Sequence, residues 1–291
     1  MVAVIDSPDF MFTGIKVQDL SKFQKTYYFI KGLFVGIIFS KTNKNFFCFL
    51  LNLSFPSKNK IHFRNNYYFK KILDKYIIHY PNKRIVRVIK DDFYHFNHLF
   101  ESYCLDEIQF TDGDKILECG ANIGELYFSF KQKSLDINYI AFEPDPEAYN
   151  CLAKNLLTAK NTTLYNIALS DVDKEKKLYI DGDGGNSSLE YFGKSKEVDV
   201  EAKTIDSFGQ DNIKLMKIEA EGHEGEVLNG ALETLKSTEY VTVDYGPEKG
   251  IEQNTTISIV VNTLYKNGFA FVSSSKHRQI GLFKNTKINN E

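Results

Sequence analysis

From residue 112 onward, short apolar runs alternate with segments whose apolar residues recur every three or four positions. Short apolar runs predict buried strands, and the three- and four-residue spacing predicts helices. The expected strands span 115–119, 138–142, 163–169, 213–219 and 239–244, followed by a closing pair at 269–273 and 280–284. The expected helices span 123–134, 146–158, 223–236 and 255–267. This alternation predicts an α/β fold, a mostly parallel seven-stranded sheet with helices on both faces.

The first hundred residues follow a different pattern. Two apolar runs, 32–39 and 46–55, flank a short polar segment, and each is about half of the roughly 20 residues that cross a bilayer. We expect no transmembrane helix here, because the runs fit either a hairpin or two short buried helices. The pattern is then helical and aromatic up to Tyr80, and we expect a strand over 84–90 and a helix over 91–106.

Charge separates these two parts, although the net charge is only −2. Residues 1–100 hold 16 basic residues against 6 acidic ones, together with 22 of the 41 Phe and Tyr residues. We therefore expect an aromatic, basic α+β extension over 1–105 and an acidic domain over 106–291. The extension suits an anionic membrane surface, a lipid-linked substrate or a nucleic acid, and the alternative is an aromatic core under a solvated lysine face.

Four cysteines lie far apart, with no Cys-x-x-Cys spacing. This spacing favours reduced, buried thiols over disulfides or a zinc site. The first ten residues hold Asp6 and Asp9 and no basic segment, so we expect no secretory signal. A cytoplasmic location follows as the expectation, with peripheral contact at the inner membrane surface as an open alternative.

The strongest chemical signal is a glycine-rich turn after the first strand of the sheet. Residues 115–124 read KILECGANIG, so Glu118 precedes Gly120 and Gly124, and the next strand ends in Glu143. Glycines let the backbone approach a ligand, and an acid like Glu143 accepts hydrogen bonds from the hydroxyls of a ribose. An acid before the turn disfavours a pyrophosphate and suits a cationic group such as the ammonium of S-adenosylmethionine.

Further motifs follow in order along the domain. They are FEP at 142–144, NIALSD at 166–171, SSL at 187–189, TID at 204–206 and KIEAEGHE at 217–224. With the turn, they make the chain resemble the FkbM family of S-adenosylmethionine-dependent methyltransferases from about Asp112 to Asn285. The resemblance implies a Rossmann-like class I methyltransferase fold. The family usually has Asp where this chain has Glu118 and Glu219, so the same charge sits on a longer side chain.

The resemblance also implies the cofactor contacts: Ala168, with Asn166 and Ser170 around it, matches the family position that borders the adenine, and Asp145 follows the ribose acid. The residues expected to bind S-adenosylmethionine are Glu118, Gly120, Asn122, Gly124, Glu143, Pro144, Asp145, Asn166 and Ala168. The family pattern places a glycine-rich segment over the site, and the alternative for that segment is an ordinary solvated loop. Its polar residues are Asn186, Ser187 and Ser188.

Methyl transfer to a hydroxyl is an in-line displacement that also needs a group to accept the hydroxyl proton. We expect Glu219, at a strand end, to contact the methionine end of the cofactor or the reacting hydroxyl. Glu221 and His223 are candidate general bases, although His223 would alternatively be an exposed neighbour of a helix cap. Glu224 and Glu226 are expected to favour the first turn of that helix.

Paired acids at a buried strand end need a positive partner, which either Lys217 or a divalent ion could supply. Asp244, at the end of the next strand, is expected beside Glu219, and such a pair is half of an octahedral oxygen site. A divalent metal is therefore an alternative and not the expectation.

The expected function is an O-methyltransferase acting on a sugar hydroxyl of a polysaccharide or glycolipid, a substrate that rests on the family resemblance. A nucleic-acid methyltransferase is the second interpretation. The acidic domain and the lack of an Asn-Pro-Pro-Tyr-type tetrapeptide disfavour it. A non-catalytic module that binds the cofactor or a glycan is the third, and the presence of both Glu118 and Glu143 argues against it. The sequence indicates no oligomeric state.

Overall fold

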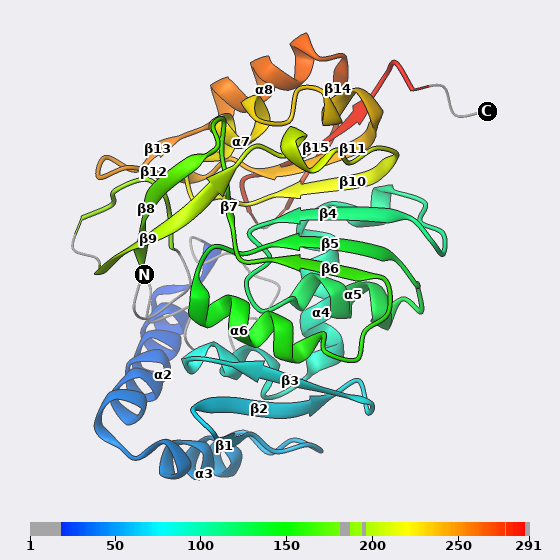
Figure 1. The fold of residues 1–291 in the computed structure, drawn as a ribbon. Helices are drawn as coiled ribbons and strands as arrows, with labels where there is room; N and C mark the ends of the chain where they lie inside the picture. The colour runs from blue at the N-terminus through cyan, green and yellow to red at the C-terminus, as the bar shows by residue number, and fades with distance from the viewer. Residues whose placement is uncertain (1–18, 181–186, 194–195, 277, 289–291) are drawn as a thin grey trace. The chain divides into compact units, whose positions relative to one another are not determined.

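The structure, a computed structural model, describes residues 19–180, 187–193, 196–276 and 278–288 (Figure 1). The chain divides into two units, residues 1–98 and residues 99–291. Sequence pattern places the boundary after residue 105, whereas the units meet after residue 98, inside helix α4 (Asp92–Ser102).

A seven-stranded sheet organises the second unit, in the order β14-β15-β11-β10-β4-β5-β6. Neighbouring strands from β11 to β6 run parallel, and β15 is antiparallel to both of its neighbours (Figure 1). The expected mostly parallel, Rossmann-like sheet is therefore confirmed. Its strands are β4 (Lys115–Cys119), β5 (Asn138–Phe142), β6 (Thr162–Tyr165), β10 (Ile213–Ile218), β11 (Thr238–Asp244), β14 (Phe269–Ser274) and β15 (Ile280–Asn285).

Helices cover both faces of this sheet, because side chains alternate along each strand. Helices α7 (Glu224–Asn229) and α8 (Ile257–Lys266) share one hydrophobic core with Ile140 of β5. The neighbouring residue Tyr139 points to the other face, where its ring lies 5.5 Å from that of Tyr127 in α5 (Glu125–Gln132). Helix α6 (Pro146–Asn155) follows β5 in the chain.

The strand expected over 163–169 is divided in the structure. Strand β6 ends at Tyr165, and β7 (Ala168–Leu169) joins a separate sheet of order β7-β9-β8, with β8 (Lys174–Ile180) and β9 (Lys196–Lys203). Asn166 lies at the break, where its Nδ2 donates to the carbonyl oxygen of Glu143 at 2.8 Å. This side-chain hydrogen bond replaces the ladder that a continuous strand would require.

Two expectations for the first unit are wrong. Residues 84–90 are not a strand, since Lys83–Val88 forms a 3-10 helix, η3, capped by the Asn82 side chain. The helical pattern up to Tyr80 is instead an antiparallel meander of β1 (His62–Arg64), β2 (Tyr67–Ile72) and β3 (Tyr76–Tyr80). Asn65 and Asn66 both have positive φ and close the first turn, and every second residue of β2 is buried. The alternate burial along β2 and the Asn65-Asn66 turn therefore identify these segments as strands of a hairpin and not as a helix.

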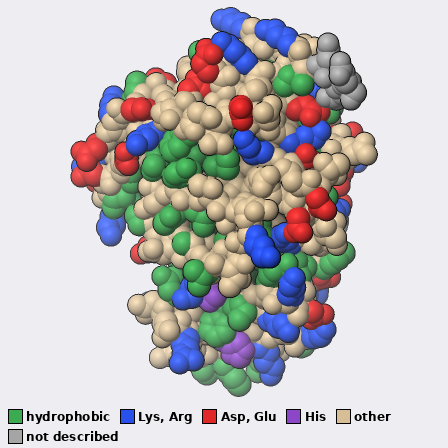
Figure 2. All heavy atoms as spheres, turned by 45° about the vertical axis from the view of Figure 1, so that its right-hand side comes forward, with side chains coloured by type: hydrophobic (Ala, Val, Ile, Leu, Met, Phe, Trp, Pro, Cys, Tyr) green, Lys and Arg blue, Asp and Glu red, His purple; other side chains and the backbone are tan. Residues whose placement is uncertain are grey.

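Helices α2 (Lys22–Lys41) and α3 (Lys44–Ser54) settle the alternative left open for the two apolar runs. They are helices, but not buried ones, because Phe34 is 53% exposed and Phe49 is 58% exposed. Within the residues the structure describes, no helix has the length and apolar content to cross a membrane. Lysine and arginine side chains lie scattered among exposed hydrophobic ones over the face in Figure 2. All four cysteines are free and buried, as expected.

Candidate functional site

Strand order reverses between β4 and β10, which makes the carboxyl ends of these strands the expected place for a ligand. The register pairs Glu118 with Lys217 across this point. Lys217 Nζ lies 3.1 Å from Glu118 Oε1 and 3.0 Å from Glu219 Oε2, and the Tyr139 hydroxyl donates to the other oxygen of Glu118. Lys217 is thus the positive partner of both acids.

The charges of this pair depend on burial and on each other. Burial raises the pKa of Glu118, although Lys217 acts in the opposite direction. Burial acts to lower the pKa of Lys217, but Tyr103, Glu219 and Glu118 together hold it well above its usual value. Lys217 therefore stays protonated at neutral pH.

Glu219 has a second cation, Arg278, which the sequence analysis missed. Arg278 Nη2 donates to Glu219 Oε1 and lies 2.7 Å from Asp244 Oδ2, while Nη1 donates to the Tyr103 hydroxyl at 3.2 Å. The Tyr103 hydroxyl in turn donates to Glu219. Asp244 does lie beside Glu219, and a guanidinium supplies the positive charge between them. Arg278 is the last of the four arginines in the chain and lies far from the other three, a signal that sequence inspection could have used.

These contacts fix the ionisation of Glu219. Burial acts to raise the pKa of Glu219, but Arg278 and Lys217 hold it well below its usual value. A carboxylate so stabilised keeps its negative charge and is a poor proton acceptor at neutral pH.

Three of the expected cofactor residues, Asn122, Asp145 and Asn166, form hydrogen bonds with Glu143 directly after β5. The backbone N–H of Asn122 donates to Glu143 Oε2 at 2.6 Å, and that of Asp145 donates to Oε1 at 2.9 Å. The Asn166 side chain donates hydrogen bonds to the backbone carbonyl oxygens of Glu143 and Pro144. Burial raises the pKa of Glu143 to about 7. The structure thus brings these residues together around a buried carboxyl group.

At both glycines of the turn, an added side chain would clash with neighbouring protein atoms. Gly120 has φ +74°, and a Cβ there would lie 2.0 Å from the carbonyl oxygen of Glu219, so the turn touches the end of β10. Gly124 has φ +87°, and a Cβ there would lie 2.8 Å from Leu152 of α6. Both positions therefore need glycine for the backbone and for packing. Ala168 is buried in β7.

The glycine-rich segment is described only in part, and Asn186 lies outside the described residues. Ser187 Oγ donates to Asp145 Oδ2 at 2.9 Å, which joins this segment to the residue after the expected ribose acid. Ser188 Oγ donates to the carbonyl oxygen of Glu221 at 2.7 Å. The two serines therefore contact both the expected cofactor residues and the loop after β10.

Glu224 closes that loop, a role beyond the helix-turn effect expected for it. Its Oε1 accepts the backbone N–H groups of Ala220 and Gly222, both at 3.0 Å, and its Oε2 accepts the Thr256 hydroxyl at 2.9 Å. The side chain is almost fully buried. Glu221, inside the loop, has φ +49°. Glu224 thus holds the chain in a tight turn directly after Glu219.

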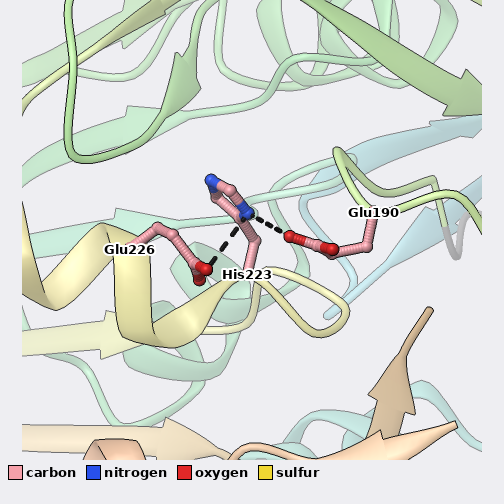
Figure 3. Close-up of side chains that lie close together, drawn as sticks. All are labelled: Glu190, His223 and Glu226. Carbon is pink, nitrogen blue, oxygen red and sulfur yellow. Dashed lines mark hydrogen bonds and ion pairs between the residues drawn. The ribbon is translucent and has the colours of Figure 1, made fainter.

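His223 is buried, so the exposed alternative for this residue does not hold. Figure 3 shows its ring between Glu190 and Glu226, with Nδ1 2.8 Å from Glu190 Oε1 and 3.7 Å from Glu226 Oε2. On the other side, Nε2 lies 3.0 Å from Ser170 Oγ and 3.3 Å from Lys176 Nζ. Both ring nitrogens therefore have close polar neighbours.

The group of Glu190, His223 and Glu226 places three metal-ligating atoms within 4.8 Å of one another. The ammonium group of Lys249 already lies beside the two carboxylates, since its Nζ is 2.7 Å from Glu226 Oε1 and 3.6 Å from Glu190 Oε1. The hydrogen bond from His223 lowers the pKa of Glu190. We interpret the group as an ion-pair network that anchors the start of α7 to the segment around Glu190.

The chain is similar to known methyltransferases. The profile of the methyltransferase FkbM domain matches residues 118–271. Methyltransferase sdnD of Sordaria araneosa is 29% identical over 175 residues, covering 46% of this chain and 67% of that protein. The 2-O-methyltransferase NoeI of Sinorhizobium fredii (strain NBRC 101917 / NGR234) is 24% identical over 196 residues, covering 60% and 80% respectively. A solved methyltransferase FkbM from Methylobacillus flagellatus KT matches with a TM-score of 0.43 at 14% identity, over 61% of this chain and 44% of that one.

Proposed function

Because this chain belongs to the FkbM methyltransferase family, we propose that it transfers a methyl group from S-adenosylmethionine to a sugar hydroxyl of a polysaccharide or glycolipid. The relative from Sinorhizobium fredii, whose name makes it a 2-O-methyltransferase, supports oxygen as the acceptor atom. The observation that carries the cofactor assignment is the buried carboxyl group of Glu143 beside the glycine-rich turn.

The residues around Glu143 fit this cofactor. A carboxyl group whose pKa is near 7 because of burial gains stability in its ionised form from new hydrogen-bond donors and from nearby positive charge. Vicinal ribose hydroxyls supply the donors, and a sulfonium supplies the charge. When bound, S-adenosylmethionine contributes the activated methyl group. Asn122 and Asp145, whose N–H groups orient the carboxyl group, fix the direction from which the ribose approaches.

We assign the remaining expected residues by their contacts. Glu219 stays ionised and orients the methionine end of the cofactor or the acceptor hydroxyl, held in place by Lys217, Arg278 and Tyr103. Glu118 fixes Lys217 from the other side. His223 anchors the loop that carries Glu221 through its contacts on both ring nitrogens.

The first unit is proposed to contact an anionic surface, either a membrane or a lipid-linked acceptor. Helices α2 and α3 together contain five lysines and no acidic residue. Large hydrophobic side chains are exposed along the same helices, including Phe23 at 81% and Leu53 at 67%. Lysines and exposed apolar side chains together are typical of segments that lie on anionic bilayers.

The cofactor assignment is tested by titration calorimetry of S-adenosylmethionine into Glu143→Ala. Hydrogen bonds to a charged acceptor contribute about 1.5–3 kcal/mol, so we expect affinity to fall by about tenfold to a hundredfold or more. Glu147→Ala, the same change at an exposed position in the next helix, is the control. Unchanged affinity in a folded Glu143→Ala protein would remove the ribose assignment, and tight binding of NAD by the wild type would overturn the cofactor.

A further inference from the structure

Glu248 lies at the carboxyl ends of β10 and β11, in the short strand β12 (Pro247–Lys249). A Cβ on Gly222 would lie 2.9 Å from the backbone carbonyl carbon of Glu248, so the loop after β10 packs directly against β12. A Cβ on Gly246 would lie 3.2 Å from Asp244 Oδ1 and 3.5 Å from Glu248 Oε1. The side chain of Glu248 therefore reaches the same glycine as Asp244, close to the site built around Glu219.

The neighbouring acids have hydrogen-bond donors. Glu219 and Asp244 share Arg278, and Glu224 accepts three hydrogen bonds. Glu248 Oε2, by contrast, is buried and has no hydrogen-bond partner among the residues that the structure describes. An unsatisfied buried acceptor destabilises the fold, and a proton or a donating ligand would remove that cost. The residue as a whole is only partly buried.

Charged groups on several neighbouring elements act on Glu248. Burial raises its pKa to about 8, helped by repulsion from Asp244 of β11, Glu219 after β10 and Glu224 of α7, while Arg278 acts in the opposite direction. General bases work best when their pKa is near the working pH. Glu219, whose pKa is held low, does not meet this condition.

Building on the proposed methyl transfer, we propose that Glu248 is the general base that accepts the proton of the acceptor hydroxyl. In this step the O–H bond breaks and its proton passes to the Glu248 carboxylate. An oxygen lone pair of the acceptor forms the new C–O bond to the methyl group, and the electron pair of the old C–S bond stays on sulfur. The products are a methyl ether and a neutral thioether.

The first test needs neither acceptor nor cofactor. In the full-length protein labelled with carbon-13 at the glutamate carboxyl groups, NMR titration should show one carboxyl group with a midpoint near pH 8. That signal should disappear in Glu248→Gln and persist in Glu252→Gln, a matched change at an exposed position nearby. Glu143, whose pKa burial raises to about 7, should titrate below this signal and is identified by its loss in Glu143→Ala. If no other glutamate titrates above about pH 6.5, or if the signal near pH 8 survives in Glu248→Gln, the proposal is wrong.

The second test measures S-adenosylhomocysteine release, with a mixture of methyl glycosides of hexoses and deoxyhexoses as the acceptor probe. Glu248→Gln should slow turnover by about a hundredfold to ten-thousandfold and abolish the increase of the rate with pH. Glu248→Asp should keep part of the turnover and part of its pH dependence. Affinity for S-adenosylmethionine should stay within about twofold in calorimetry. A tenfold loss of that affinity, or unchanged turnover in Glu248→Gln, would assign Glu248 another role.

The two proposals fail in different ways. A wild-type protein that does not bind S-adenosylmethionine contradicts the proposed function, whatever Glu248 does. A wild-type protein that binds the cofactor and lacks the titrating Glu248 signal contradicts only the assignment of the base.

Discussion

Replacing Lys217 with Met removes the cation shared by Glu118 and Glu219. The side chains of Lys217 and Glu118 are only 2% and 4% exposed, so their ion pair is screened little by solvent. Glu219 keeps Arg278 and Tyr103, whereas Glu118 keeps the Tyr139 hydroxyl without a cation. Removing one partner of a buried pair costs about 3–5 kcal/mol. A unit of this size loses about 2–4 °C in Tm per kcal/mol, so we expect Tm to fall by about 6–20 °C.

The cost should depend on pH in a defined direction. Burial already raises the pKa of Glu118 in the wild type, and loss of Lys217 raises it further. The folded state disfavours the ionised form of Glu118. The loss of stability in Lys217→Met is therefore fully present above the folded-state pKa of Glu118. It disappears as pH falls toward the ordinary carboxyl range, where Glu118 is protonated in both states. Urea unfolding at pH 7.5 and pH 5 measures the difference.

The double variant Glu118→Gln with Lys217→Met isolates the ion pair. Removing both charges leaves no uncompensated carboxylate at position 118, so we expect the double variant to be more stable than Lys217→Met alone. Glu239→Gln with Lys214→Met, at a more exposed ion pair of the same sheet, is the matched comparison and should show a coupling below about 1 kcal/mol. A cost below about 1 kcal/mol for Lys217→Met, or a double variant no better than the single one, would refute the argument.

Two other predictions concern the glycine turn and the first unit. Gly120→Ala should destabilise the protein more than Gly113→Ala in denaturant unfolding. Both have positive φ, but only the Cβ at residue 120 meets a backbone oxygen; equal effects would remove the packing argument. Binding of the wild type to anionic liposomes should weaken as salt rises toward 1 M. A variant with four lysines changed to Gln should bind these liposomes more weakly and should keep its affinity for S-adenosylmethionine. The four residues are Lys41, Lys44, Lys58 and Lys60. Equal wild-type binding to anionic and neutral liposomes, or no binding to either, would favour the alternative that these lysines form a solvated face over an aromatic core.

The sheet domain was predictable because its local signals agree. Apolar runs, glycine turns and strand-end acids all indicate the same parallel topology, and the structure places Glu118, Glu143 and Glu219 at the carboxyl ends of their strands. The first unit was harder to predict, since aromatic and lysine residues suit both helices and strands. There the pair Asn65-Asn66, whose positive φ closes a hairpin, decided between them.

The site was predictable only where a residue lies at the carboxyl end of a strand. Lys217 and Asp244 do so, and their proximity to Glu219 follows from strand order. Arg278, Tyr103 and Glu248 reach the site from distant segments or by way of a turn, and sequence spacing carries no information about such approaches. The split of the expected strand at Asn166 has a similar origin, because its hydrogen bond reaches a carbonyl of another strand.

The charged row across the strand ends also bears on product release. Three acids, Glu118, Glu219 and Asp244, alternate with two cations, Lys217 and Arg278, so the row carries a formal charge of −1. A sulfonium donor brings a positive charge that balances this excess, whereas its thioether product has lost that charge. Under the proposed function, this excess negative charge would attract the sulfonium donor and would hold its neutral thioether product less strongly.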